Sequence, residues 1–172
     1  RSLLAGKSFD DRACVAAIEG CLELLAKRRH SWDVYAVATT QEEVGLRGAT
    51  TSAYGVAPQL AIALDVTFGS QPGVSDSESM GMGDGPSIGL GANFHPKVHE
   101  RLVATAKAHE IPYQIDPTPG RSMHTPVETI DTRDAERAAR LLAEFIAELD
   151  GEFAQVLGVQ VKRLSGQGGQ AC

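Results

Sequence analysis

The chain has 172 residues, of which 42% are hydrophobic and 22% are charged, a composition typical of a soluble globular domain. This length suits one domain with a substantial core. The formal net charge of −6 argues against nucleic acid as a partner, because phosphate binding requires a clustered basic surface. No apolar run approaches the ~20 residues of a membrane-spanning helix, and no signal peptide is visible, so no membrane partner is expected.

The use of cysteine favours a reducing, cytoplasmic location. Cys14 and Cys21 fall on one expected helix and would stand about 10 Å apart at ~1.5 Å rise per residue, too far for a disulfide. Cys172 ends a polar tail over 165–172, which we expect to be disordered. We therefore interpret the first two cysteines as small buried hydrophobic residues.

The first half of the chain predicts a helix followed by a buried strand. Apolar residues recur at helical spacing over 11–30, and Asp10 or Asp11 is a plausible N-cap. The run 33–40 is β-branched and aromatic with almost no charge, which is typical of a strand buried on both faces of a parallel sheet.

The middle of the chain repeats this alternation. A short helix is expected around 48–55, and a second buried strand-like run follows at 60–66. Residues 69–87 are rich in Gly, Ser, Pro and Met and predict a long loop, of the kind that is usually functional or mobile.

The last third predicts two helices around a short strand. Helical spacing covers 96–109, a strand is expected over 111–115, and an irregular stretch at 116–130 leads into a helix opened by Asp131 and Thr132. Alternating helices and strands predict an α/β fold, a three-layer α/β/α sandwich.

Acidic side chains and one histidine stand at the edges of these units: Asp10, Asp11, Glu42, Glu43, Asp65 and His124. In a parallel sheet the carboxyl ends of strands and the amino ends of helices open onto one edge, so these groups are expected to converge. Several carboxylates at one point repel one another unless a cation is present, and Asp, Glu and His suit Zn²⁺ or Co²⁺. Scattered acids that act as caps and turn residues are the alternative.

Three other patterns carry weaker signals. The segment 81–86 resembles a phosphate-binding loop, but it lacks the G-x-G-x-x-G spacing and follows no strand, so a flexible loop is expected. His95 and His99 share a helix face without the Glu of H-E-x-x-H, which favours surface or capping histidines. Ser122 near His124 lacks the strand–Ser–helix elbow of a serine triad.

Four segments, 9–12, 41–49, 64–67 and 123–128, occur in the order found in the M42 metallopeptidases, which the chain resembles over everything but its tail. These are the glutamyl and tetrahedral (TET-type) aminopeptidases, also labelled endoglucanase M or cellulase M. The resemblance implies a zinc-peptidase-like catalytic domain over residues 1–164, two divalent metal ions, Zn or Co, and a peptide substrate. It also implies a homo-oligomer in the complete protein.

The resemblance also assigns roles to the acidic residues. Asp10 resembles the carboxylate that bridges both metals, with Asp11 as its neighbour. Glu43 and His124 resemble ligands of one metal, and Asp65 a ligand of the other.

Glu42 matches the family's general base, which takes a proton from the metal-bridging water and passes it to the leaving amine. Of the two adjacent glutamates, Glu43 would be neutralised by the metal while Glu42 stays free to accept a proton.

The chain departs from the family pattern in two places. Family members begin well before the motif at 9–12, and that part supplies a further histidine ligand and an inserted assembly domain. The family also has a Gly-Thr-Asp-Ala segment and a strand between positions that are here joined at Ser122 and Met123. We therefore expect the second metal site to be weak or empty, and the 172-residue chain alone to be nearly inactive.

Two alternatives to an aminopeptidase remain open. The chain could be an incomplete metal-binding fragment or scaffold of such an enzyme. A glucanase, suggested by the older family label, is disfavoured because Glu42 and Glu43 are adjacent in sequence rather than placed across a cleft.

Overall fold

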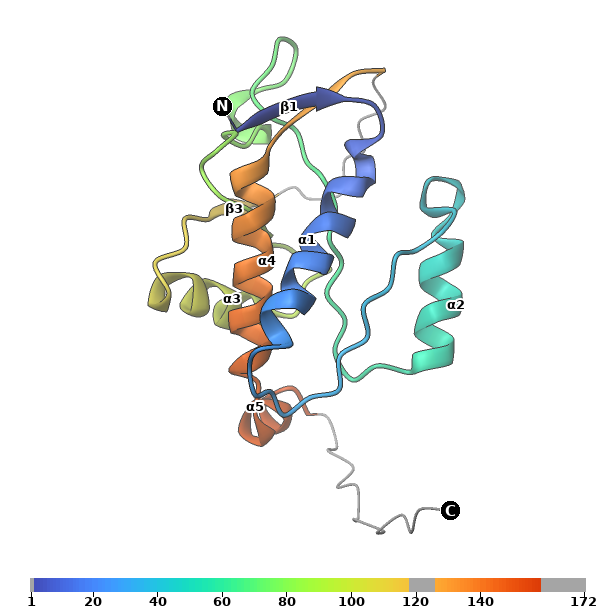
Figure 1. Cartoon of the computed structure of the whole chain (residues 1–172), viewed down its shortest axis with the longest axis vertical. Helices are drawn as coiled ribbons and strands as arrows, with labels where there is room; N and C mark the ends of the chain where they lie inside the picture. Colours follow the sequence, from blue (N-terminus) through green and yellow to red (C-terminus); the bar gives the residue numbers. More distant parts are fainter. Residues whose placement is uncertain (1, 118–125, 159–172) are drawn as a thin grey trace.

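The structure, a computed structural model, describes residues 2–117 and 126–158. Its helices are α1 (Phe9–Leu25), α2 (Arg47–Val56), α3 (Pro96–Ala108), α4 (Thr132–Ala147) and α5 (Gly151–Val156). Its strands are β1 (Leu3–Gly6), β2 (Ser87–Gly89), β3 (Gln114–Asp116) and β4 (Glu128–Asp131), and two short 3₁₀ turns are η1 (Glu42–Val44) and η2 (Asp76–Glu78). Figure 1 shows this arrangement.

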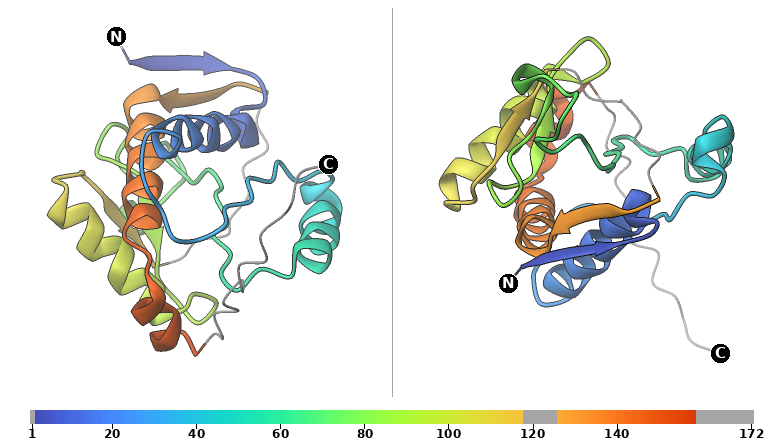
Figure 2. Two further views of the ribbon diagram at one scale, coloured as in Figure 1. Left: turned by 60° about the horizontal axis from the view of Figure 1, so that its bottom comes forward. Right: turned by 90° about the horizontal axis from the view of Figure 1, so that it is seen from above.

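Helices α1 and α4 lie side by side and form the spine of the domain (Figures 1 and 2). Small residues let them approach closely: a Cβ built on Gly20 would stand 3.2 Å from the Cβ of Ala139. Cys21 and Leu25 of α1 are buried against Ala139 and Ala143 of α4. This contact joins the amino-terminal quarter of the chain to its carboxy-terminal quarter.

The other face of α4 packs on α3 and on α5. Leu141 lies with Ile88, Ala106 and Ile111 in one buried cluster. Phe145, which is fully buried, lies in a second cluster that includes Val98, Leu149 and Phe153. One helix therefore supplies buried side chains to all three hydrophobic clusters.

Two strand pairs flank the helices. Strand β1 runs antiparallel to β4, with Leu3 opposite Asp131, and β2 runs parallel to β3, with Ser87 opposite Gln114. Strand β3 overlaps the end of the strand expected at 111–115. The β1–β4 pair places the start of α1 beside the start of α4.

The strands expected at 33–40 and 60–66 are absent; both segments run as long stretches without regular secondary structure (Figure 1). A strand exists only when its N–H and C=O groups pair with a neighbouring strand. Among the described residues, no backbone hydrogen bond reaches 33–39 or 58–64. The prediction of two buried strands is therefore wrong: the composition is strand-like, but no ladder pairs these segments and none of their residues is fully buried.

These two segments and α2 form an arm beside the α1–α4 spine (Figure 1). The arm is attached to the core by Trp32, Leu60 and Ile62, which pack against the cluster around Phe145. Helix α2 itself has no buried residue, and the side chain of Tyr54 is 91% exposed.

The helices expected from sequence are confirmed with small changes at their ends. Helix α1 ends at Leu25 rather than at His30, and its N-cap is Ser8 rather than Asp10 or Asp11. Asp131 caps α4 as expected, since its carboxylate accepts a hydrogen bond of 3.0 Å from the Arg133 amide. The α/β fold class is confirmed. Within the described ranges no helix is long and apolar enough to cross a bilayer.

Glu144 anchors the carboxy-terminal end of α1 to α4. Its carboxylate, 7% exposed, receives a hydrogen bond from the Arg28 guanidinium and lies 3.6 Å from the His109 ring. His109 also contacts Glu148 at 2.7 Å, so α1, α3 and the end of α4 meet here. The Arg28 hydrogen bond, and then the nearby positive charges, hold the pKa of Glu144 below its ordinary value.

We expect Glu144→Gln to lower the free energy of unfolding at pH 7 by about 1–3 kcal/mol, because the hydrogen bond from Arg28 loses its charged acceptor. A depressed pKa stabilises the fold above the unfolded-state value of 4.5, and this contribution disappears as the pH falls further. Urea unfolding between pH 7 and pH 3 measures the effect; the variant should lose less stability on acidification. Glu136→Gln, an exposed acid on α4, is the matched control.

Candidate metal centre

Asp10 and Asp11 stand in the first turn of α1, directly after β1. Their backbone angles are not helical and the peptide bond between them is cis. The Asp10 amide donates a hydrogen bond of 2.8 Å to the carboxylate of Glu128, the first residue of β4. Asp11 accepts a hydrogen bond of 3.3 Å from the Cys14 amide.

Glu128 is therefore a residue of the site that sequence reasoning did not single out. It belongs to the motif at 123–128, so the signal was present. Its role in the structure is to fix the backbone of Asp10 across the β1–β4 pair.

Asp10 and Asp65 both lie close enough to Asp11 for their charges to act on it. Burial raises the pKa of Asp11 to about 6; the negative charges of Asp65 and Asp10 add to the rise, while hydrogen bonds from Cys14 oppose it. The same surroundings raise the pKa of the Cys14 thiol, through burial first and then through Asp11. The negative charges of two neighbouring carboxylates thus act on Asp11, an environment that a divalent cation would neutralise.

Glu42 and Glu43 lie in η1, between the segment 33–40 and α2. Both side chains are exposed. The turn is closed by the carbonyl of Glu42, which accepts hydrogen bonds from the amides of Gly45 and Leu46 at 3.2 and 3.0 Å. Gly45 adopts a φ of 116°, which favours glycine. The η1 end of the arm and the amino end of α1 lie toward the same end of the molecule (Figure 1).

Asp65 is exposed at the end of the segment expected as the second strand. Its carboxylate accepts a hydrogen bond of 2.8 Å from the amide of Val66. Two residues further on, the Thr67 hydroxyl donates to the carboxylate of Asp116 at 3.2 Å, and Asp116 is 3% exposed. The position of Asp65 is thus tied to the end of β3.

The structure brings together part of the expected set. Asp10 and Asp65 both interact electrostatically with Asp11, whereas His124, like the junction at Ser122 and Met123, lies outside the described residues. Within 2–117 and 126–158, no three His, Cys, Asp or Glu side chains meet the geometry of a metal site. The carboxylate chemistry of Asp10 and Asp65 nevertheless suits a hard or borderline divalent ion.

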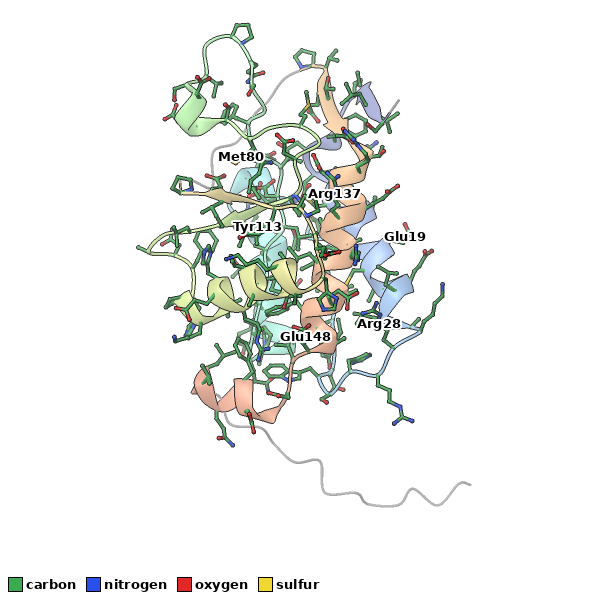
Figure 3. All side chains as sticks on the ribbon, turned by 90° about the vertical axis from the view of Figure 1, so that its left-hand side faces the viewer. Glu19, Arg28, Met80, Tyr113, Arg137 and Glu148 are labelled. Carbon is green, nitrogen blue, oxygen red and sulfur yellow. The ribbon has the colours of Figure 1, made fainter. Side chains whose placement is uncertain are left out.

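The segment expected as a flexible loop at 81–86 is instead firmly held. Gln114 and Asp134 bond to its backbone, and Arg137 points from α4 towards it (Figure 3). His99, expected on the surface or at a cap, contacts the carbonyl of Gly89 at 2.9 Å. Cys14 and Cys21 are free, as expected.

Comparison with known proteins places the chain in a family. The family of M42 glutamyl aminopeptidases matches residues 1–122. Lysyl aminopeptidase from Pyrococcus furiosus is 34% identical over 82% of this chain and 47% of its own length.

Solved structures give the same result. An aminopeptidase from the archaeon Desulfurococcus kamchatkensis is 40% identical with a TM-score of 0.83, over 92% of this chain and 53% of its own. A TET aminopeptidase from a marine sediment archaeon of the Thaumarchaeota is 30% identical with a TM-score of 0.79, over 90% of this chain and 52% of its own. The chain thus spans about half the length of these relatives. It belongs to the M42 glutamyl aminopeptidase family.

Proposed function

We propose that this chain supplies much of the active site of a metal-dependent aminopeptidase that removes amino-terminal residues from peptides. The observation that carries the proposal is that Asp10 and Asp65, which come from distant segments, both lie close enough to the half-buried Asp11 for their charges to act on it. Membership of the M42 family, with a lysyl aminopeptidase and other aminopeptidases among the relatives, supports this chemistry over a glucanase.

The residues that would hold two divalent ions, Zn²⁺ or Co²⁺, are Asp10, Glu43, Asp65 and His124. The backbone of Asp10 is held by the hydrogen bond that its amide donates to Glu128. Asp65 lies two residues before Thr67, whose hydroxyl is bonded to Asp116. When bound, such ions lower the pKa of water and polarise a carbonyl group.

Glu42 would act as the general base. It is exposed, so its carboxylate is accessible to a substrate and to water. Its backbone carbonyl closes the η1 turn, which fixes where its side chain starts. Glu42 would accept the proton of the attacking water and deliver it to the leaving amine.

We further propose that the complete protein is cytoplasmic and forms a homo-oligomer. The similarity to a TET aminopeptidase supports the assembly. Light scattering after size-exclusion chromatography measures the oligomeric state directly.

Metal titration of the 172-residue chain tests the proposal. We expect calorimetry with Co²⁺ or Zn²⁺ to detect binding that Glu43→Ala or His124→Ala weakens at least tenfold, because each removes a ligand. The second ion should bind weakly, and hydrolysis of an aminoacyl-anilide by the chain alone should be close to background. Absence of any binding would support a non-catalytic scaffold instead, and hydrolysis of carboxymethyl-cellulose that persists in chelator would support a glucanase.

A further inference from the structure

Three side chains hold the 80–86 loop by its backbone. Asp134 accepts hydrogen bonds from the amides of Gly83 and Gly85, at 2.6 and 2.9 Å. Arg137 donates to the carbonyl of Gly83 at 2.6 Å and to Asp134 at 3.0 Å. Gln114 accepts from the amide of Gly81 at 2.8 Å and donates to the carbonyls of Gly81 and Gly85 at 3.0 and 2.9 Å. We call Gln114, Asp134 and Arg137 the clamp.

The shape of the loop suits the clamp because of two glycines. Gly83 and Gly85 have φ angles of 88° and 104°, which side-chain-bearing residues rarely adopt. A Cβ on Gly83 would meet the Arg133 guanidinium and, at 2.9 Å, the carboxylate of Asp131, and one on Gly85 would collide with the carbonyl of Pro112. The loop is therefore pressed against the start of α4 and the approach to β3.

The clamped loop is joined to the segment that carries Asp65. The Met80 amide donates a hydrogen bond of 2.7 Å to the carbonyl of Phe68, and Gly69 and Met80 form a parallel bridge. Figure 3 shows Met80 and Arg137 in this region. Strand β3 provides a second contact with this segment. Asp116, which ends β3 two residues after Gln114, accepts a hydrogen bond from the hydroxyl of Thr67.

We propose that the clamp consists of positioning residues for Asp65: Asp134, Arg137 and Gln114 fix the 80–86 loop, and the loop together with Asp116 fixes segment 65–69. This inference rests on the proposed metal-binding role of Asp65. In this proposal the clamp residues contact the loop and would contact neither metal nor substrate. Asp65 is exposed, and within the described part of the chain its carboxylate accepts a hydrogen bond only from the adjacent Val66 amide, so its placement depends on these neighbouring contacts.

Hydrogen exchange measured by mass spectrometry on the full chain tests the mechanical link without any metal. In Asp134→Ala, two amides lose their acceptor, and we expect exchange over 66–69 as well as 81–85 to accelerate about tenfold or more. Asp84→Asn removes the same charge from an exposed position in the loop itself and should leave 66–69 unchanged. Acceleration confined to 81–85 overturns the proposal.

Co²⁺ binding supplies a readout that a purely structural role would not move. Thr67→Val deletes the hydroxyl that reaches Asp116, whereas Thr67→Ser keeps it. We expect Thr67→Val to weaken Co²⁺ binding about tenfold and to alter the visible absorption of the bound ion, with Thr67→Ser restoring both. Equal affinity and identical spectra in Thr67→Val and the parent overturn the proposal.

The two measurements separate the inference from the function on which it rests. If the parent chain binds no Co²⁺ at all, the metal-binding role of Asp65 fails, and with it the proposal that the clamp positions a ligand. If the parent binds Co²⁺ but exchange over 66–69 is insensitive to Asp134→Ala, only the clamp proposal fails. Thermal unfolding of each variant confirms that the comparison is made on folded protein.

Discussion

Glu42→Gln and Glu43→Gln are expected to have opposite signatures although the residues are neighbours. Glu42→Gln should leave Co²⁺ affinity within about twofold and lower peptide hydrolysis about 10²–10⁴-fold, the usual contribution of a general base. Glu43→Gln should weaken Co²⁺ binding at least tenfold, because a neutral amide replaces a charged ligand. Both glutamates are exposed in η1, so neither change should disturb the core.

Calorimetry on the chain measures the affinities. Because the chain spans about half of its relatives, hydrolysis is best followed in a chimaera. In it, the Desulfurococcus kamchatkensis aminopeptidase supplies the part of its sequence outside the matched region. Glu78→Gln, an acid in η2, is the control for loss of charge. Loss of metal binding in Glu42→Gln, or its retention in Glu43→Gln, would contradict the assignment.

Phe145→Ala is expected to lower the free energy of unfolding by about 3–5 kcal/mol, the range measured when a buried aromatic ring is deleted. Phe145 has no exposed surface and meets the ring of Phe153 edge-on, with centroids 6.3 Å apart. It also lies in the cluster through which Trp32 and Leu60 attach the arm to the core. The loss is a large part of the 5–15 kcal/mol that stabilises a typical domain.

Urea unfolding followed by circular dichroism measures this effect. Tyr54→Ala is a suitable control, because it removes a ring that is 91% exposed on α2 and should change stability by no more than about 0.5 kcal/mol. Comparable losses in the two variants would contradict the importance given to the cluster around Phe145. If Phe145→Ala does not fold, Phe145→Leu takes its place, and we expect it to lower the free energy of unfolding by a smaller amount.

The sequence predicted the helices well because their information is local. Helical spacing and the cap at Asp131 predicted the ends of α4 to within two residues, and helical spacing predicted those of α3 to within one. Strands depend on partners that may be far away in the chain: Leu3 pairs with Asp131, and nothing near Leu3 indicates this. The run 33–40 has strand composition without a strand partner among the described residues, so composition alone misled.

The candidate site was predictable to a similar degree. Asp10 and Asp65, two of the acids at the ends of segments, both lie close enough to Asp11 for their charges to act on it. The strands at 33–40 and 60–66, from which their convergence was predicted, are absent. The clamp was not predictable, because Asp134 and Arg137 lie 51 and 54 positions from the glycine that they bind. A glycine-rich segment looks flexible in sequence when the side chains that hold it belong to another element.

The close contact between Gly20 and Ala139 sets the distance between α1 and α4. Asp10 and Asp11 lie at the amino-terminal end of α1, about 15 Å from this contact at ~1.5 Å per residue. A methyl group added at Gly20 would stand 3.2 Å from the Cβ of Ala139, so α1 and α4 would have to move apart by a few tenths of an ångström. We expect part of that displacement to reach Asp10 and Asp11, so that a substitution at the helix–helix contact alters the spacing of the carboxylates.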